Sequence, residues 1–247
     1  ARCKGRALHA QRFSEYPPRG LEFRFARTPM GDRHQAETFF LDGPAGPLEA
    51  ILWWTPSSAP PLAALVCHPH PLFGGTMHNK VVFQAAKAFD KLALPVLRVN
   101  FRGAGLSAGK HDKGIGEQDD VRAAIDFLAK RFPSSSVVLA GFSFGCWVGF
   151  REGCADSRVI ELVGMGAPVN GSDFSFLQSC SKPKLFLQGG RDHYGSRRKL
   201  ERLAASLPGE NRVVIIEDAD HFFAGHFEPM AAELTKWLKS RHPEISS

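Results

Sequence analysis

The sequence predicts an α/β protein with a doubly wound, mostly parallel sheet. Short apolar runs rich in branched residues alternate along the chain with longer stretches of helical character. These runs lack polar alternation, as expected when helices cover both faces of a parallel sheet. The first two runs, at residues 37–43 and 47–54, instead alternate around a turn at residues 43–46, as the strands of a hairpin do. We therefore expect an antiparallel N-terminal hairpin at the edge of the sheet.

The remaining elements follow from the same alternation of patterns. Six more strands are predicted at residues 63–67, 94–100, 135–141, 159–165, 184–189 and 212–217. Helices are predicted between and after them, at residues 79–92, 117–132, 144–153, 196–207 and 228–240. Ligands of such sheets bind at the carboxyl ends of the strands, so the chemistry is expected in the loops that follow each run.

Length and composition indicate a soluble globular protein. The 247 residues are 43% hydrophobic and 23% charged, which suits one α/β domain. No apolar run approaches the roughly 18 residues of a membrane span, and the N-terminal residues lack the apolar core of a signal peptide. The five cysteines are an odd number without C-x-x-C spacing, as in a reducing compartment. We expect a cytoplasmic protein.

The net charge of +6 is concentrated at the front of the chain. Residues 1–29 hold seven Arg and Lys against two Glu, so the other 218 residues carry only +1. This distribution argues against a nucleic-acid-binding body. Residues 1–29 are interpreted as a basic N-terminal extension, and residues 30–247, from Met30, as a single domain.

A nucleophile motif follows the strand predicted at residues 135–141. Residues 141–145 read G-x-S-x-G, centred on Ser143, and a helical stretch comes next. In the order strand, sharp turn and helix, this motif exposes the serine hydroxyl at the top of a sheet and at the positive end of a helix. Ser143 is the predicted nucleophile.

A serine nucleophile needs a base and an orienting carboxylate, and both occur downstream. Asp192 follows the strand predicted at residues 184–189, and His221 follows the next strand. Asp218 and Asp220 also lie near His221, but they would have to fold back onto it. The predicted triad is therefore Ser143, Asp192 and His221, in the chain order that α/β-hydrolases use.

Two further motifs make the sequence resemble the α/β-hydrolase superfamily, within it the small lidless serine esterases and dienelactone-hydrolase-like proteins. Residues 68–80 read HPHPLFGGTMHNK and residues 100–107 read NFRGAGLS. The resemblance covers roughly residues 37–240 and implies the α/β-hydrolase fold. About fifteen residues separate residue 168 from the strand at 184, too few for the helical cap of many larger relatives, so no cap domain is expected.

The resemblance also implies an oxyanion hole. One amide of such a hole follows the nucleophile, here Phe144, and the other comes from the loop after the strand at residues 63–67. The two prolines of that loop carry no N–H, which leaves His70, Leu72 and Phe73. Superfamily spacing favours His70. Leu72, Phe73 and Phe222 are candidates for contacts with the substrate.

The expected function is a serine carboxylesterase that hydrolyses short-chain acyl esters through an acyl-enzyme. A thioesterase, lactonase or peptidase with the same triad is the alternative, and a non-catalytic binding protein on this fold is a weaker one. A zinc site of His68, His70 and His78 is disfavoured because the loop is stiffened by prolines and lacks acidic or Cys ligands. We expect no metal and no cofactor. The expected partner is a small-molecule ester, without nucleic acid or membrane, for a monomer or homodimer.

Overall fold

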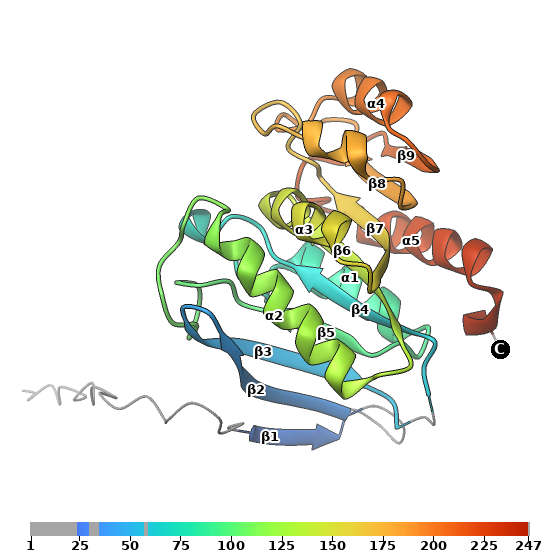
Figure 1. Cartoon of the computed structure of the whole chain (residues 1–247). Coiled ribbons are helices and arrows are strands. Elements are labelled where there is room, and N and C mark those ends of the chain that lie inside the picture. Colours follow the sequence, from blue (N-terminus) through green and yellow to red (C-terminus); the bar gives the residue numbers. More distant parts are fainter. Residues whose placement is uncertain (1–23, 30–34, 57–58, 247) are drawn as a thin grey trace, which may run out of the picture.

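One sheet organises the part of the chain that the structure describes. The computed structural model describes residues 24–29, 35–56 and 59–246. Nine strands are hydrogen-bonded in the order β1-β2-β3-β5-β4-β6-β7-β8-β9 (Figure 1). The strands are β1 Arg24–Pro29, β2 Gln35–Gly43, β3 Gly46–Trp54, β4 Leu62–Cys67, β5 Val96–Val99, β6 Ser136–Phe142, β7 Val159–Met165, β8 Lys184–Gly189 and β9 Asn211–Ile216.

Helices cover both faces of the sheet, which confirms the doubly wound prediction. The helices are α1 Lys80–Asp90, α2 Gly116–Arg131, α3 Phe144–Ala155, α4 Arg197–Ser206 and α5 Phe227–Arg241, with short 3-10 turns η1 Pro71–Phe73, η2 Ser175–Ser179 and η3 Pro243–Ser246. One core packs α2, α3 and α4 against the sheet, and a second packs α1 and α5 against its other face. Strands β4 and β6 are buried along nearly their whole length, which explains why their sequences lack polar alternation.

The predicted hairpin is present, but it is not the outermost element. Strands β2 and β3 pair antiparallel in register around Gly43 and Gly46. Strand β1 pairs antiparallel with β2, so residues 24–29 belong to the sheet although the sequence placed them in the N-terminal extension. The sheet therefore starts earlier in the chain than the sequence predicted. The reason is the pairing of β1 with β2, which no local sequence pattern reveals. Residues 1–23 and 30–34, including Met30, lie outside the described residues.

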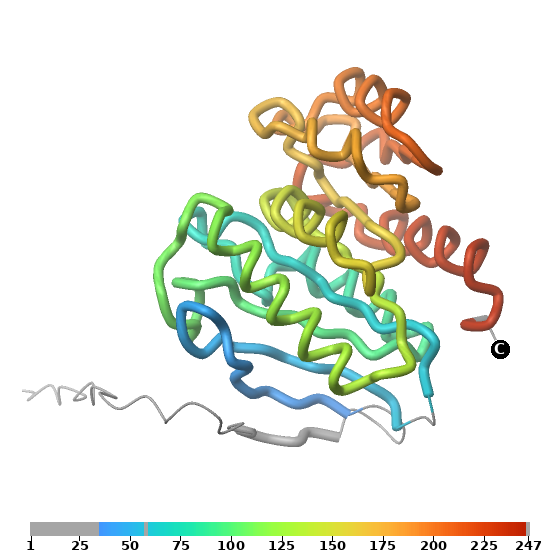
Figure 2. Tube along the Cα trace, viewed as in Figure 1, coloured from blue at the N-terminus to red at the C-terminus, as the bar shows by residue number. Residues whose placement is uncertain are grey.

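The topology brings several loops to one edge of the sheet. Strand β4 lies between β5 and β6, and the pairs β4–β5, β4–β6, β6–β7, β7–β8 and β8–β9 are all parallel. Figure 2 shows the chain entering the middle of the sheet at β4, returning to β5 and then adding strands toward β9. The loops after β4, β6, β8 and β9 therefore share one edge.

Among the residues that the structure describes, no cap domain interrupts the fold. Between β7 and β8 the chain forms only a loop and the short turn η2, as the spacing of the sequence predicts. Among the described residues, no helix has the length and apolarity to cross a membrane.

Candidate active site

Ser143 occupies a sharp turn between β6 and α3. Its backbone has φ 54° and ψ −117°, a region that non-glycine residues rarely adopt. The flanking glycines make the turn possible. A Cβ on Gly145 would lie 2.5 Å from the carbonyl oxygen of His68, and one on Gly141 would lie 2.4 Å from that of Gly145. Neither glycine has a positive φ, so close packing rather than backbone freedom explains why the motif needs them.

The three residues of the predicted triad meet at the edge shared by the loops. The Nε2 atom of His221 lies 3.0 Å from Oγ of Ser143, and its Nδ1 atom lies 2.8 Å from Oδ2 of Asp192. The side chain of Asp192 is fully buried and that of His221 nearly so. With Nδ1–H donating to the carboxylate, Nε2 is free to accept the serine proton.

Asp192 is held by a network that sequence reasoning missed. Its Oδ1 atom accepts the N–H groups of Tyr194 at 2.7 Å and Gly195 at 3.2 Å. Its Oδ2 atom accepts a 2.6 Å hydrogen bond from Nε2 of Gln188 as well as that of His221. Gln188 is itself buried and bonded to Ala167 N and Gly195 O. The available signal was Gln188, a polar residue next to the end of the strand KLFLQG, directly after the apolar residues LFL.

The competing aspartates serve other purposes. Asp218 forms an exposed 2.6 Å ion pair with Arg191. Oδ1 of Asp220 accepts the N–H groups of Phe222 at 2.9 Å and Ala224 at 3.1 Å. These hydrogen bonds shape the turn after His221. Asp220 has no hydrogen bond to the imidazole of His221 among the described residues.

The loop after β4 distinguishes among the three candidate oxyanion amides. Leu72 N–H donates to Nδ1 of His70 at 3.3 Å, and Phe73 N–H donates to O of His70 at 3.1 Å. Within the described residues, the N–H of His70 has no hydrogen-bond partner. Phe144 is the first residue of α3, where N–H groups have no intrahelical acceptor. The amides of His70 and Phe144 are therefore the two available donors, although three candidates were open from the sequence.

Aromatic rings pack around the Phe144 side of the site. The His70 ring lies 4.7 Å from the Phe144 ring and 4.6 Å from the His111 ring, measured between centroids. Nδ1 of His111 lies 2.7 Å from Oε1 of the buried Glu117. Burial is the main cause that lowers the pKa of His70. The His70 ring thus accepts the N–H of Leu72, and its carbonyl accepts those of Phe73 and Gly75, so that only its backbone N–H lacks a partner among the described residues.

His68 joins two loops and is not available to a metal. Its Nδ1 atom lies 2.6 Å from Pro69 O, and its Nε2 atom accepts the N–H of Phe101 at 2.9 Å. Burial lowers the pKa of His68 to about 4, so the ring is neutral and both nitrogens are engaged. Across residues 24–29, 35–56 and 59–246, no cluster of three or more His, Cys, Asp or Glu side chains is arranged to hold a metal ion.

The NFRGAGLS motif is structural. Asn100 accepts the N–H of Met77 and donates to Glu49 at 2.7 Å, which ties the loops after β4 and β5 to β3. Arg102 and Asp120 form a buried pair at 2.7 Å that anchors the second loop to α2. These contacts hold the glycine-rich segment in place, which agrees with a loop-anchoring role for Arg102 rather than contact with a substrate.

Exposed apolar side chains surround the triad. Leu72 and Phe73, after β4, are 70% and 86% exposed, and Phe222, after β9, is 52% exposed. The Phe222 ring lies 5.2 Å from that of His221, and the Tyr194 ring lies 4.5 Å from it. Contact of Leu72, Phe73 and Phe222 with a substrate stays a prediction.

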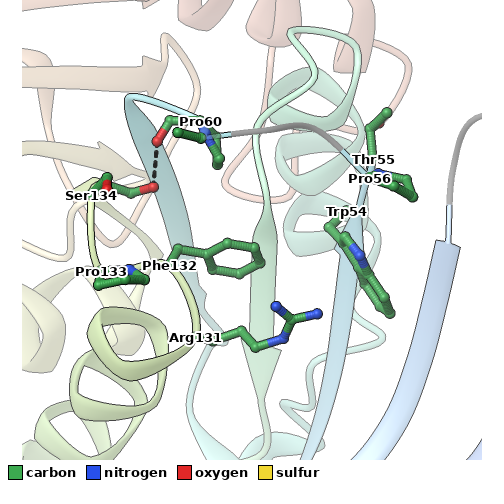
Figure 3. Close-up of a pocket in the computed structure, with 10 residues that line it drawn as sticks. Trp54, Thr55, Pro56, Pro60, Arg131, Phe132, Pro133 and Ser134 are labelled. Carbon is green, nitrogen blue, oxygen red and sulfur yellow. Dashed lines mark hydrogen bonds between the residues drawn. The ribbon is translucent and has the colours of Figure 1, made fainter.

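A cavity elsewhere in the fold is separate from this site. It has a volume of about 360 Å³ and lies at the amino ends of β4 and β6, opposite the carboxyl edge that carries Ser143. Figure 3 shows Trp54, Arg131 and Phe132 among its lining residues. Ser143 lies at the other end of these strands, so the cavity is not part of the candidate site.

Comparison with known proteins agrees with this architecture. Residues 73–235 match a family model described as an alpha/beta hydrolase domain. An uncharacterized protein of Rickettsia prowazekii (strain Madrid E) is 36% identical over 208 residues, covering 81% of this chain and 87% of the relative.

Solved structures of similar proteins extend the likeness to three dimensions. An α/β serine hydrolase without a lid from Xanthomonas campestris has 35% identity and a TM-score of 0.77, covering 83% of this chain and 94% of the other. An alpha-beta serine hydrolase homologue from Coxiella burnetii has 33% identity and a TM-score of 0.77, with 82% and 97% covered. The extent of these matches shows that the chain belongs to the alpha/beta hydrolase family and is a hydrolase.

Proposed function

We propose that the protein is a serine carboxylesterase that hydrolyses esters of short acyl chains through a covalent acyl-enzyme. The observation that carries this proposal is the unbroken contact from Ser143 Oγ through His221 to Asp192, at 3.0 Å and 2.8 Å. A hydroxyl becomes a useful nucleophile when a positioned base removes its proton. Ser143 is half-buried in the turn between β6 and α3, where its Oγ faces the base His221.

The first half of the reaction acylates the enzyme. Ser143 Oγ attacks the ester carbonyl carbon while His221 Nε2 takes the hydroxyl proton. The carbonyl oxygen becomes an oxyanion, which the N–H groups of His70 and Phe144 stabilise together with the positive end of α3. His221 then gives its proton to the alcohol oxygen as the C–O bond breaks. The alcohol leaves, and the acyl group remains on Ser143.

The second half repeats these steps with water. His221 Nε2 takes a proton from water as the water oxygen attacks the acyl carbon. Collapse of the second oxyanion breaks the bond to Ser143 Oγ, which recovers the proton from His221. The carboxylate of Asp192 stays ionised throughout and stabilises the imidazolium in both halves.

The preference for short acyl chains rests on the shape of the site. The residues that surround the triad lie on loops after β4, β8 and β9, and no described segment forms a cap over them. Each buried methylene adds about 0.8 kcal/mol, but a chain that passes beyond the exposed Phe73 and Phe222 side chains meets water and gains nothing more. The observations therefore favour small acyl groups over long lipids.

The decisive experiment is covalent labelling with a fluorophosphonate, followed by peptide mapping. We expect one phosphonylated residue, Ser143, in the wild type, and no adduct in Ser143→Ala. Ser172→Ala, which changes a serine on the loop after β7, is the control and should label fully. An adduct at another residue, or full labelling of Ser143→Ala, would contradict the proposal. Rates on matched oxygen esters, thioesters and lactones then distinguish an esterase from the alternative hydrolases with the same triad.

A further inference from the structure

Two cysteines meet at the end of α3 that is remote from Ser143. Cys154 lies in the last turn of α3, and Cys180 directly follows the turn η2. Their side chains are hydrogen-bonded to each other, and both thiols are free. Eleven residues of helix separate Ser143 from Cys154, a distance of about 16 Å. The pair is thus independent of the proposed catalytic site.

Two lysines surround this pair and are fixed by backbone carbonyls of the same segments. Lys182 Nζ donates to Gly153 O at 2.6 Å and also to Asp156 O. Lys184 Nζ donates to Cys180 O and, at 2.8 Å, to Lys182 O. The two ammonium groups therefore lie beside the sulfurs, where positive charge stabilises a thiolate.

The environment makes the two thiols unequal. The hydrogen bond from Cys154 is the main cause that lowers the pKa of Cys180 to about 6, and both lysines act in the same direction. The same hydrogen bond raises the pKa of Cys154. Burial lowers the pKa of both lysines, which the neighbouring sulfurs oppose. Cys180 thus has the character of the attacking thiolate and Cys154 that of its resolving partner.

A second pair of neighbouring cysteines in the same chain provides a contrast. Cys67 on β4 and Cys146 on α3 are both fully buried. Burial raises the pKa of Cys67 to about 12 and also raises that of Cys146. These thiols stay protonated and are expected to be inert.

We propose that Cys154 and Cys180 form a redox modification site whose ligand is a small hydroperoxide. The Cys180 thiolate attacks one peroxide oxygen, the O–O bond breaks, and the departing hydroxide takes a proton to become water. Cys180 is then a sulfenic acid. Cys154 sulfur attacks Cys180 sulfur, its proton and the hydroxyl leave as water, and the S–S bond forms. One hydrogen peroxide thus accepts two electrons from two thiols and yields two waters.

Access limits the oxidant to small molecules. Cys180 is only 3% exposed, and Cys154 is partly buried. A sulfur buried to this degree calls for an oxidant as small as hydrogen peroxide rather than a bulky disulfide such as oxidised glutathione. The bond formed would join the end of α3 to the segment that leads into β8. Such a cross-link restricts the unfolded chain, so oxidation should raise the melting temperature.

The test uses the full chain carrying Cys3→Ser, because Cys3 lies outside the described residues. The protein is treated with hydrogen peroxide, alkylated after unfolding, digested without reductant and mapped by mass spectrometry. We expect a Cys154–Cys180 cross-link that dithiothreitol reverses, with Cys67 and Cys146 recovered as alkylated thiols. Cys154→Ser should trap Cys180 as a sulfenic acid that dimedone labels. Cross-linking of Cys67 to Cys146 to the same extent, or recovery of Cys154 and Cys180 as free thiols, would overturn the proposal.

A second measurement tests the role of the lysines. Hydrogen peroxide should oxidise Cys180 in the folded protein at pH 7 faster than it oxidises Cys67 or Cys146, measured as loss of the free thiol. Lys182→Gln should slow that reaction about threefold to tenfold by removing a nearby positive charge. Lys199→Gln, on the exposed face of α4, is the matched control and should not change the rate. Equal rates in the two variants would overturn the assigned charge effect, and ester hydrolysis serves only to show that each variant is folded.

Discussion

Replacing Asp192 by asparagine tests the assignment of the orienting carboxylate. All four groups that contact this carboxylate are donors: His221 Nδ1 and Gln188 Nε2 at one oxygen, and two backbone N–H groups at the other. An asparagine amide must turn its NH₂ toward one of these two pairs. Facing the backbone pair would leave two buried donors unsatisfied, at about 1–3 kcal/mol each. Facing His221 leaves only one N–H of Gln188 without an acceptor, because the other N–H still donates to Gly195 O and the imidazole can change its tautomer.

The favoured orientation of Asp192→Asn therefore removes the base. His221 Nδ1 would accept from the amide, and Nε2 would carry a proton toward Ser143 Oγ. We expect kcat to fall about 10⁴-fold, or about 5.4 kcal/mol of activation free energy. The free energy of unfolding should fall by about 1–3 kcal/mol, the cost of one unsatisfied donor.

Asp220→Asn is the matched control on the His221 loop. Its Oδ1 atom accepts both loop N–H groups, and an amide oxygen can do the same. We expect kcat within about twofold and stability within about 0.5 kcal/mol of the wild type. Initial rates on p-nitrophenyl acetate and thermal unfolding measure both quantities. Residual activity of Asp192→Asn above about a tenth, or a larger loss in Asp220→Asn, would refute the assignment of the acid.

Three further predictions concern the nucleophile, the acyl pocket and metals. Ser143→Ala and Ser143→Gly should both lower turnover about 10⁴-fold to 10⁶-fold. Only the glycine variant should have a higher melting temperature than the wild type, because glycine relieves the strained backbone by about 1 kcal/mol. Equal melting temperatures of the two variants would argue against strain. On p-nitrophenyl esters, kcat/KM should peak between about two and six acyl carbons and fall well below its maximum by about twelve. Phe73→Ala should shift that optimum to longer chains without loss of stability, because the ring is 86% exposed; a wild-type profile still rising at twelve carbons would contradict the open site. EDTA should leave the rate of ester hydrolysis unchanged. Inactivation by EDTA that zinc reverses would instead indicate a zinc site that includes His68 and His70.

Local patterns in the sequence were sufficient to predict most of the secondary structure and the triad. These features are encoded by neighbouring residues, so they can be recognised without knowledge of the fold. They include the buried strands without polar alternation, the helices between them and the glycine-flanked Ser143. Asp192 and His221 were predictable because parallel strands bring the ends of successive elements to one edge. The contacts among Ser143, His221 and Asp192 then follow from that topology.

Other features depend on which segments meet, and only the tertiary structure decided them. The pairing of β1 with β2 assigns residues 24–29 to the sheet, although their basic composition suggested an extension. The hydrogen bonds that engage Leu72 and Phe73 leave His70 as the available amide, a choice among three that loop composition could not make. The thiols of Cys154, at the end of α3, and Cys180, directly after η2, are far apart in sequence but in contact in the fold. Each of these features depends on a contact between segments that are far apart in the sequence. The energy of such a contact is set by the geometry of both segments, and no short window of sequence contains both.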